Sequence, residues 1–364
     1  MKNASGIARI RALCQLRLPA EQFVPALLET LHRLIASARN LFDFTDANGH
    51  LVRYYFEGPI DHEIARHYFE HFHNRREAEV MPTFEQAISG RAVVLSAEDL
   101  NNARFFRSAL YNEIWRPQGL HSRIEAVVRD DVGRPLGSLV LYRGKDDPQF
   151  TRNDEALLAA IVPYIARALT AEAVAPSGWA DRADGRASIV LSARGELVQA
   201  SEHALRILLL AHGGITPATA ARVPRREDFS SLSRLWMEVH RGDDVWLQSA
   251  SLAVENAWGR FLFEAEPLLP IADRAESSTT VHVSIRHQQS AAVALRRALD
   301  SIPLSAAQRE VAALLYGGHA QTEIATKLGI APSTVADHVK KIYTSTDVHS
   351  VQELHTRIDA ELCR

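Results

Sequence analysis

The chain has 364 residues, of which 46% are hydrophobic and 23% charged, and this predicts two or three domains with a core in each. A formal net charge of −3 argues against a protein that coats nucleic acid, and no apolar run approaches the roughly 18–20 residues that span a bilayer. The two cysteines, Cys14 and Cys363, lie near opposite ends, so we expect no disulfide framework and a cytoplasmic location.

The first region, residues 18–172, has the pattern of a sensor-type α+β domain. Apolar residues recur at helical spacing from Phe23 to Ile35. We expect two hairpins. One turns at Asn48-Gly49, a dipeptide that favours the positive φ of tight turns, and the other at residues 130–133. The other expected elements are a helix over residues 60–76 and an amphipathic helix from Thr151 to Leu169.

Residues 176–185 are polar, contain two glycines and a proline, and are expected to form a hinge. The second region, residues 186–286, predicts another small α+β sensor domain. The elements expected in it are a hairpin over residues 188–200, a helix over 204–211, and strands over 245–254, 259–263 and 279–286. A helix over residues 290–301 should then connect the sensors to the C-terminal region, and we assign residues 287–302 to this linker.

The C-terminal region, residues 303–362, has the spacing of a helix-turn-helix. Counted from Gln321, Ala325 supplies the small residue where two helices cross, and Gly329 permits the turn. Ile330 and Val335 are the apolar residues that hold the second helix in place. An element of this kind places one helix in the major groove of DNA.

The same region resembles the tetrahelical DNA-binding domain of LuxR-type (NarL/FixJ-like) regulators. The matching positions are Leu304-Ser305, Arg309-Glu310-Val311, Glu323-Ile324-Ala325, Leu328-Gly329-Ile330, Thr334-Val335, His338-Val339, Ile342, Val348, Ser350 and Glu353-Leu354. The resemblance implies DNA contacts through Ser333, Thr334, Ala336, Asp337, His338, Lys340 and Lys341. Among these it implies base-facing positions for Ala336, Asp337 and Lys340, with His338 and Lys341 nearer the DNA backbone. It also implies dimerisation through the last helix, although the four candidates could equally pack within the domain: Val348, Leu354, Ile358 and Leu362.

Three residues depart from the pattern of this family. Ala331 stands where a serine cap is frequent, which could cost about 0.5–2 kcal/mol. Ala336 replaces a frequent lysine, and Thr346 replaces an apolar anchor. From residue 303 onward six lysines and arginines face seven aspartates and glutamates, a balance of −1. Because phosphate neutralisation supplies most non-specific DNA affinity, a single copy of this domain should bind DNA weakly.

The two sensor regions also resemble known families. The first is similar to GAF-like sensors, notably at residues 68–73 and 116–121, and the second is more weakly similar to a PAS domain. Both folds commonly enclose a pocket, so the resemblance implies a small-molecule ligand. The candidate ligand residues are His71, Trp115, His121 and Arg143. His121 could equally be a loop residue and Arg143 a strand-end charge, and the tryptophans are more often core or lid residues.

Metal binding and catalysis are not expected. His62, Glu63, His67, His71 and His73 suggest a metal site, because residues 63, 67 and 71 share a helical face. The aromatic residues between them favour unbound surface or interface histidines instead. The sequence has no phosphate-binding loop, nucleophile elbow or zinc-protease motif, so we expect no cofactor and no enzymatic activity.

These patterns predict a multidomain α+β chain in which two α/β sensor domains, GAF-like and then PAS-like, precede an all-α tetrahelical helix-turn-helix domain. We expect a one-component transcription regulator that forms a homodimer. Its expected partners are promoter DNA, RNA polymerase and a small molecule, without a membrane. Two alternatives stay open, namely N-terminal regions that bind another protein and an enzyme that acts on a small molecule.

Overall fold

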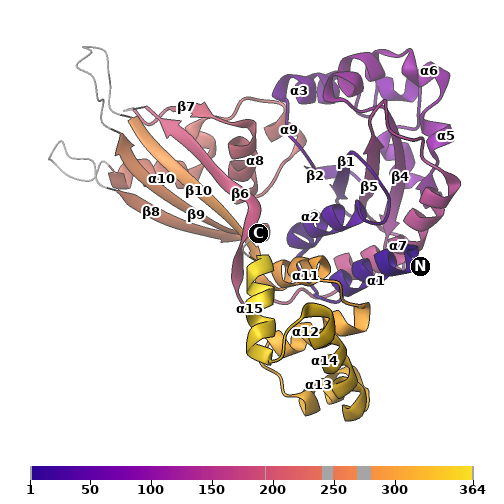
Figure 1. The fold of residues 1–364 in the computed structure, drawn as a ribbon. Coiled ribbons are helices and arrows are strands. Elements are labelled where there is room, and N and C mark those ends of the chain that lie inside the picture. The colour runs from indigo at the N-terminus through magenta and orange to yellow at the C-terminus, as the bar shows by residue number, and fades with distance from the viewer. Residues whose placement is uncertain (1, 193, 240–248, 269–279, 363–364) are drawn as a thin grey trace.

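The computed structural model describes residues 2–192, 194–239, 249–268 and 280–362. Two five-stranded antiparallel sheets with their helices precede a C-terminal helical bundle (Figure 1), which confirms the predicted multidomain α+β class. Within the described residues, no helix is long and apolar enough to cross a membrane.

The first sheet has the strand order β2-β1-β5-β4-β3. Its strands are β1 (Arg39–Thr45), β2 (Leu51–Phe56), β3 (Val94–Leu95), β4 (Ser122–Arg129) and β5 (Pro135–Arg143). Both predicted hairpins are confirmed, and their turns contain Gly49 at φ 88° and Gly133 at φ 85°. These positive φ angles favour glycine because it lacks a Cβ.

Helices cover both faces of this sheet. On one face lie α1 (Lys2–Cys14), α2 (Ala20–Leu31) and α7 (Arg152–Thr170), which contact one another and the strands (Figure 1). The segments associated with the other face are α3 (His62–His71), η1 (Arg76–Glu79), α4 (Phe84–Ser89), α5 (Ala97–Leu100), α6 (Ala103–Phe106), η2 (Leu110–Trp115) and η3 (Arg116–Gln118). The helix expected over residues 60–76 is therefore shorter, and it ends at His71.

Helix α1 was not predicted. Its sequence has a weak apolar pattern, with Gly6 and two arginines between the few large apolar residues. Ile10 and Leu13 are nevertheless buried at 0% and 3% exposure, because α1 packs on α2 and α7. Tertiary contact rather than local propensity stabilises this helix.

The second sheet has the order β7-β6-β10-β9-β8, which repeats the topology of the first. Its strands are β6 (Trp179–Leu191), β7 (Leu197–Ala200), β8 (Ala250–Asn256), β9 (Gly259–Leu268) and β10 (Thr280–Ser290). Its helices are α8 (Glu202–Ala211), α9 (Pro217–Ala220), η4 (Arg226–Asp228) and α10 (Ser230–Val239). Part of the strand expected over residues 245–254, residues 245–248, lies outside the described residues.

The predicted hinge over residues 176–185 is wrong for its second part, since β6 begins at Trp179. Asp181, Ala180 and Trp179 pair with the end of β10. Polar residues fill this part of β6 because most of its side chains are exposed or only half-buried. The polar composition therefore indicated a loop where backbone pairing to β10 forms a strand.

The second domain packs against β2, the edge strand of the first sheet. The Tyr54 amide donates to the Ile215 carbonyl at 2.9 Å, and the Tyr55 ring stacks on Trp258 with centroids 5.8 Å apart. The His62 ring lies 2.8 Å from the Ala220 carbonyl. The buried apolar residues of both domains form one continuous cluster, and the second domain covers part of the edge strand β2.

Helix α11 (Ala291–Ser301) begins directly after β10, with no loop between them. The predicted helix over residues 290–301 is confirmed, but residues 287–290 of the assigned linker belong to the strand. Val293 packs in the core shared by the first two domains, and Leu299 in the core of the C-terminal bundle. One helix therefore contributes to both cores.

The bundle itself consists of α12 (Ala306–Tyr316), α13 (Gln321–Leu328), α14 (Pro332–Thr346) and α15 (Val351–Leu362). Ser305 caps α12 through a reciprocal pair of hydrogen bonds with Gln308. Arg309 is buried at 3% exposure and donates to the Leu304 carbonyl at 2.7 Å, which fixes the entry to the bundle.

Candidate DNA-binding surface and sensor cavity

The turn between α13 and α14 has the geometry of a helix-turn-helix. Gly329 ends α13 in the left-handed conformation at φ 64°, and the Ile330 amide donates to the Ala325 carbonyl at 3.1 Å. Ala325 is 5% exposed within the core of the bundle. Its small side chain allows α13 and α14 to approach closely, as its position in the sequence predicted.

Helix α14 has one buried and one exposed face. Val335, Val339 and Ile342 recur at helical spacing and are buried in the bundle. The other face carries most of the predicted DNA-binding residues, which are exposed: Ser333, Thr334, Ala336, Asp337, Lys340 and Lys341. His338 is half-buried, and its Nδ1 has no hydrogen-bond partner within the described residues. The exposed residues lie together, as a groove-reading face requires.

The N-terminus of α14 opens without a side-chain cap. Ala331 is the N-cap residue and Pro332 is in the first turn, so the amides at this end rely on backbone carbonyls or on an external acceptor. A helix N-terminus carries partial positive charge and can accept a phosphate. Ser333 and Thr334 are exposed at this end, where a phosphate would lie.

The predicted dimer contacts Val348, Leu354 and Ile358 require correction. Their exposed fractions are 6%, 0% and 0%, since they pack in the core of the bundle, and Leu362 is half-buried against the same core. A side chain enclosed within one copy of the chain offers no surface to a second copy. These residues therefore pack within the domain, which was the alternative reading of the sequence.

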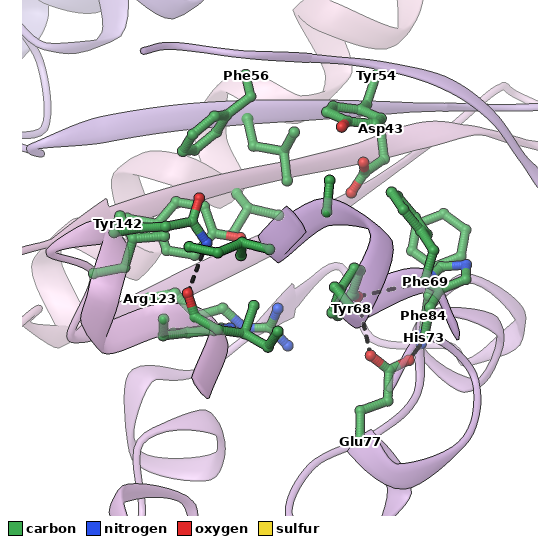
Figure 2. Close-up of a pocket in the computed structure, with 18 of the residues that line it drawn as sticks. Asp43, Tyr54, Phe56, Tyr68, Phe69, His73, Glu77, Phe84, Arg123 and Tyr142 are labelled. Carbon is green, nitrogen blue, oxygen red and sulfur yellow. Dashed lines mark hydrogen bonds between the residues drawn. The ribbon is translucent and has the colours of Figure 1, made fainter. Parts of the chain in front are cut away.

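A cavity of about 140 Å³ lies in the first domain between the sheet and α3 (Figure 2). Alternation along the strands determines what faces it. Phe42 and Phe44 pack in the core, whereas Leu41 and Asp43 line the cavity. Aromatic side chains supply much of the wall: Tyr54, Phe56, Tyr68, Phe69, Phe84, Trp115 and Tyr142.

Of the described residues that line the same cavity, five carry charged side chains: Asp43, Asp61, Glu77, Arg123 and Glu125. Glu77 accepts from the amides of Asn74 and Phe84 at 2.9 and 2.8 Å, and from the Tyr68 hydroxyl at 3.1 Å (Figure 2). Glu125 accepts from the Ser138 hydroxyl at 2.6 Å and lies 3.4 Å from Arg123. Asp61 is exposed and caps α3, where it accepts from the amides of Glu63 and Ile64 at 2.9 and 3.0 Å. Asp43 is the remaining group.

Asp43 lies on β1, directly opposite Tyr54 on β2 and Ser138 on β5. It is 8% exposed, and its carboxyl has no hydrogen-bond or ion-pair partner in the described part of the chain. Burial raises the pKa of this carboxyl well above its ordinary value, and the nearby Glu125 raises the pKa further. Burial also lowers the pKa of His73, so this histidine is neutral near pH 7.

The four predicted ligand residues do not lie together. Trp115 lines the cavity, whereas His71 is exposed at the end of α3. The His121 ring stacks on Phe106, and its Nδ1 is hydrogen-bonded to the Tyr111 hydroxyl at 2.8 Å. His121 does not line the cavity. Arg143 donates to the carbonyls of residues 36, 148 and 149, so it is a structural residue. His71, His121 and Arg143 therefore lie outside the wall of this cavity, and their roles as ligand residues stay predictions.

Asp43 and Arg123 were missed in the sequence. The available signal was an acid or base among the apolar residues of a strand, as in Leu41-Phe42-Asp43-Phe44 and Arg123-Ile124-Glu125-Ala126. Such a residue either faces solvent or faces a polar cavity. The sequence could not distinguish the two cases, because the segments that cover this face lie far along the chain.

The histidines around α3 have separate partners. His67 lies 2.7 Å from Glu113, and its ring packs on His71 with centroids 4.9 Å apart. His62 lies against the Ala220 carbonyl. Among the residues that the structure describes, no three histidines, cysteines or carboxylates gather as a metal site would need.

Comparison with known families agrees with this geometry. Residues 19–169 match the family model for the GAF domain. Residues 302–357 match the model described as bacterial regulatory proteins, luxR family. A search of curated proteins found no match.

Among solved structures, the similarities are weak. The phage VqmA-DPO complex is 17% identical, with a TM-score of 0.20 over 48% of this chain and 83% of that one. The sensor region of a sensor histidine kinase is 18% identical, with a TM-score of 0.19 over 45% and 62%. The E. coli DhaR(N)-DhaL complex is 16% identical, with a TM-score of 0.24 over 77% and 89%.

The two family matches coincide with the cavity-containing first domain and with the C-terminal bundle that exposes α14. The chain thus contains a GAF domain and, at its C-terminal end, a DNA-binding domain of the luxR family of bacterial regulatory proteins.

Proposed function

We propose that this chain is a one-component transcription regulator without enzymatic activity. In this proposal a small molecule bound in the GAF cavity controls the binding of α14 to promoter DNA. The observation that carries this proposal is α11, which contributes Val293 to the sensor core and Leu299 to the DNA-binding core. A change in the sensor domains that moves this helix also moves the bundle.

A second contact supports the same coupling. The Asp300 carboxylate at the end of α11 lies 3.2 Å from Arg9 of α1 and 3.3 Å from Arg309 of α12. Arg9 belongs to the helical layer on the GAF sheet, and Arg309 to the DNA-binding bundle. One carboxylate therefore joins the two parts directly.

The second sheet supports a PAS-like assignment for residues 186–286, because its strand order is that of the GAF sheet. In this proposal the second domain transmits the signal, since β10 continues into α11 without a loop. A ligand can change the position of the DNA-binding bundle only if the chain has two arrangements and the ligand binds them with different affinities.

We also propose a homodimer on DNA, with RNA polymerase as the partner at the promoter. The charge balance of −1 from residue 303 onward gives a single copy little attraction for phosphates, and two copies double the number of contacts. With the apolar residues of α15 buried, the proposed dimer contact involves exposed surface outside Val348, Leu354 and Ile358.

The test is sequencing of DNA fragments retained by the purified full-length protein, followed by gel retardation on the selected site. The double substitution of Lys340 and Lys341 by alanine should abolish retardation, because both lysines are exposed on α14. Lys145→Ala is the matched control, since this exposed lysine lies in the loop after β5. Unchanged retardation by the double variant would rule out α14 as the reading surface.

Binding of another protein by the N-terminal regions is the alternative to small-molecule sensing. The cavity of about 140 Å³ in the GAF domain favours a small molecule. Mass spectrometry of gently purified protein separates the two, because a retained small molecule supports sensing and a co-purifying polypeptide supports docking.

A further inference from the structure

The charges around the GAF cavity are not balanced. Among the described residues on its wall, Arg123 is the one arginine or lysine, and its guanidinium lies 3.4 Å from Glu125. Glu77 is satisfied by two backbone amides and a tyrosine hydroxyl. Asp61 is exposed and accepts from two backbone amides at the start of α3. Asp43 is buried and has no partner in the described residues, so it is the buried acidic group available to a bound molecule.

This balance disfavours an anionic ligand. A carboxylate or phosphate near Arg123 would compete with Glu125 for the guanidinium and would face Asp43 and Glu77 as well. A cation is favoured instead, because the Asp43 carboxylate can accept hydrogen bonds from it and is not paired with another side chain in the described residues. Charge-assisted hydrogen bonds of this kind are shorter and stronger than neutral ones.

Aromatic rings lie beside the free carboxyl. Tyr54 is the cross-strand neighbour of Asp43, and its ring centroid is 6.1 Å from that of Phe69. Phe69 in turn packs on Tyr68 with centroids 5.1 Å apart. Figure 2 shows Asp43 pointing from the sheet toward these side chains of α3. The faces of such rings attract a cation, most strongly where water is excluded.

We propose that the GAF cavity binds a small organic ammonium ion whose N–H groups donate to Asp43 and whose charge lies against Tyr54, Tyr68 and Phe69. This inference rests on the proposed sensing role and adds the chemical class of the ligand. The volume limits its size, because a cavity of about 150 Å³ holds a molecule like benzene. The ligand therefore carries one ring, or a short chain of similar volume.

Binding of this class of ligand has a proton signature. In the empty site Asp43 holds a proton more tightly than a free aspartate does, because burial raises the pKa of its carboxyl. The groups that face it are Glu125, Arg123, Glu77, Tyr54, Tyr68 and Tyr142. When an ammonium ion binds, a proton held by Asp43 is lost to solvent and the carboxylate pairs with the ammonium. One proton is released for each cation bound, up to the fraction of Asp43 that was protonated.

The experiment is isothermal titration of the full-length protein near pH 7 with three probes of nearly equal size: benzylamine, benzyl alcohol and benzoate. We expect benzylamine to bind about tenfold more tightly than benzyl alcohol, because the ammonium adds a charge-assisted hydrogen bond. Benzoate should not bind measurably. Titration in two buffers of different ionisation enthalpy should show proton release with benzylamine only.

Asp43→Asn is the decisive variant, because it keeps the shape of the side chain and removes its charge. It should lower the affinity for benzylamine about tenfold and leave that for benzyl alcohol unchanged, which also shows that the cavity is intact. Glu63→Gln is the matched control, since Glu63 is an exposed carboxylate on α3 outside the cavity wall.

Three outcomes would overturn the assignment of ligand class. They are a preference for benzoate, equal affinity for benzylamine and benzyl alcohol in the wild-type protein, and no binding of any probe. None of them bears on DNA retardation, which tests the proposed function. Conversely, loss of retardation would leave a measured preference for the amine standing.

Discussion

Asp43 provides a prediction about stability at the scale of one residue. Burial raises the pKa of its carboxyl, so the folded protein keeps a proton that the unfolded chain loses near pH 4. Stability is therefore lost as pH rises from the unfolded pKa to the folded one, by about 1.4 kcal/mol for each pH unit in that interval. Asp43→Asn removes this loss.

The variant should consequently gain stability over the wild type as pH rises, and the gain should be smallest near pH 4–5. Thermal unfolding followed by circular dichroism from pH 5 to pH 8 measures the difference in midpoint. Glu98→Gln controls for the loss of a charge, because Glu98 is exposed. A difference that stays constant with pH would show that Asp43 does not titrate above its ordinary pKa.

Lys341 and Lys340 differ in their expected roles although both are exposed on α14. If Lys341 contacts a phosphate, Lys341→Ala should weaken binding to all sequences alike and reduce the slope of log affinity against log salt by about 1. If Lys340 faces a base, Lys340→Ala should relax the preference at one base pair by about 1–3 kcal/mol. Fluorescence anisotropy on selected and scrambled sites from 50 to 200 mM salt tests both.

Identical effects from the two substitutions would contradict this division of roles. Lys145→Ala provides the reference, because this lysine lies outside the DNA-binding domain. Its slope should equal that of the unsubstituted protein.

At the scale of elements, the start of α14 offers a test of helix capping. The N-cap residue Ala331 has φ −67° and ψ 146°, an extended conformation that a capping serine adopts without strain. Ala331→Ser should stabilise the bundle by about 0.5–1 kcal/mol, since the new hydroxyl can accept from an amide of the first turn. Thermal unfolding of the full-length protein measures the shift.

Ala336→Ser is the matched control, because the same change within the helix provides no cap and should be neutral or slightly destabilising. If the two serines had equal effects, capping at residue 331 would not be the cause.

Elements that depend on neighbouring residues could be predicted from the sequence, whereas elements that depend on contacts with distant segments could not. The hairpins at Gly49 and Gly133 and the turn at Gly329 were predicted correctly, because each requires a positive φ that the local sequence favours. Helix α1 and the first part of β6 were missed, because contacts with distant segments stabilise them.

The candidate sites follow the same division. The exposed face of α14 could be derived from the spacing of Val335, Val339 and Ile342 within one helix. The cavity could not, since it combines β1, β2, β4 and β5 with α3, and only the folded chain brings Asp43 beside Tyr68 and Phe69. Trp115 was singled out in the sequence and lies on the cavity wall, but a large aromatic residue indicates a core position as readily as a cavity wall.

At the scale of the whole molecule, the three parts share buried contacts. The GAF domain and the second domain share one core across β2, and α11 extends from the second domain into the DNA-binding bundle. Rigid elements with shared cores can transmit a change between distant sites when they have two arrangements. The contact most open to a test is Asp300, which is 10% exposed and lies between Arg9 and Arg309.

Asp300→Asn should loosen the DNA-binding bundle from the GAF domain without unfolding either part. It leaves Arg309, whose side chain is 3% exposed, without its carboxylate, and a buried charged group that loses its partner costs about 1–3 kcal/mol or more. Hydrogen exchange in α1 and α11 should therefore become roughly tenfold faster, while the exposed face of α14 should retain its affinity for DNA. Glu29→Gln is the matched control. Glu29 of α2 pairs with Arg297 of α11, so this pair also links α11 to the GAF domain, but Glu29 is 47% exposed. An exposed ion pair contributes little to stability, so hydrogen exchange in this variant should be as slow as in the wild type.

Equal exchange rates in the two variants would show that the Asp300 contact does not hold the two parts together. The coupling would then depend on the packing of Val293 and Leu299 alone.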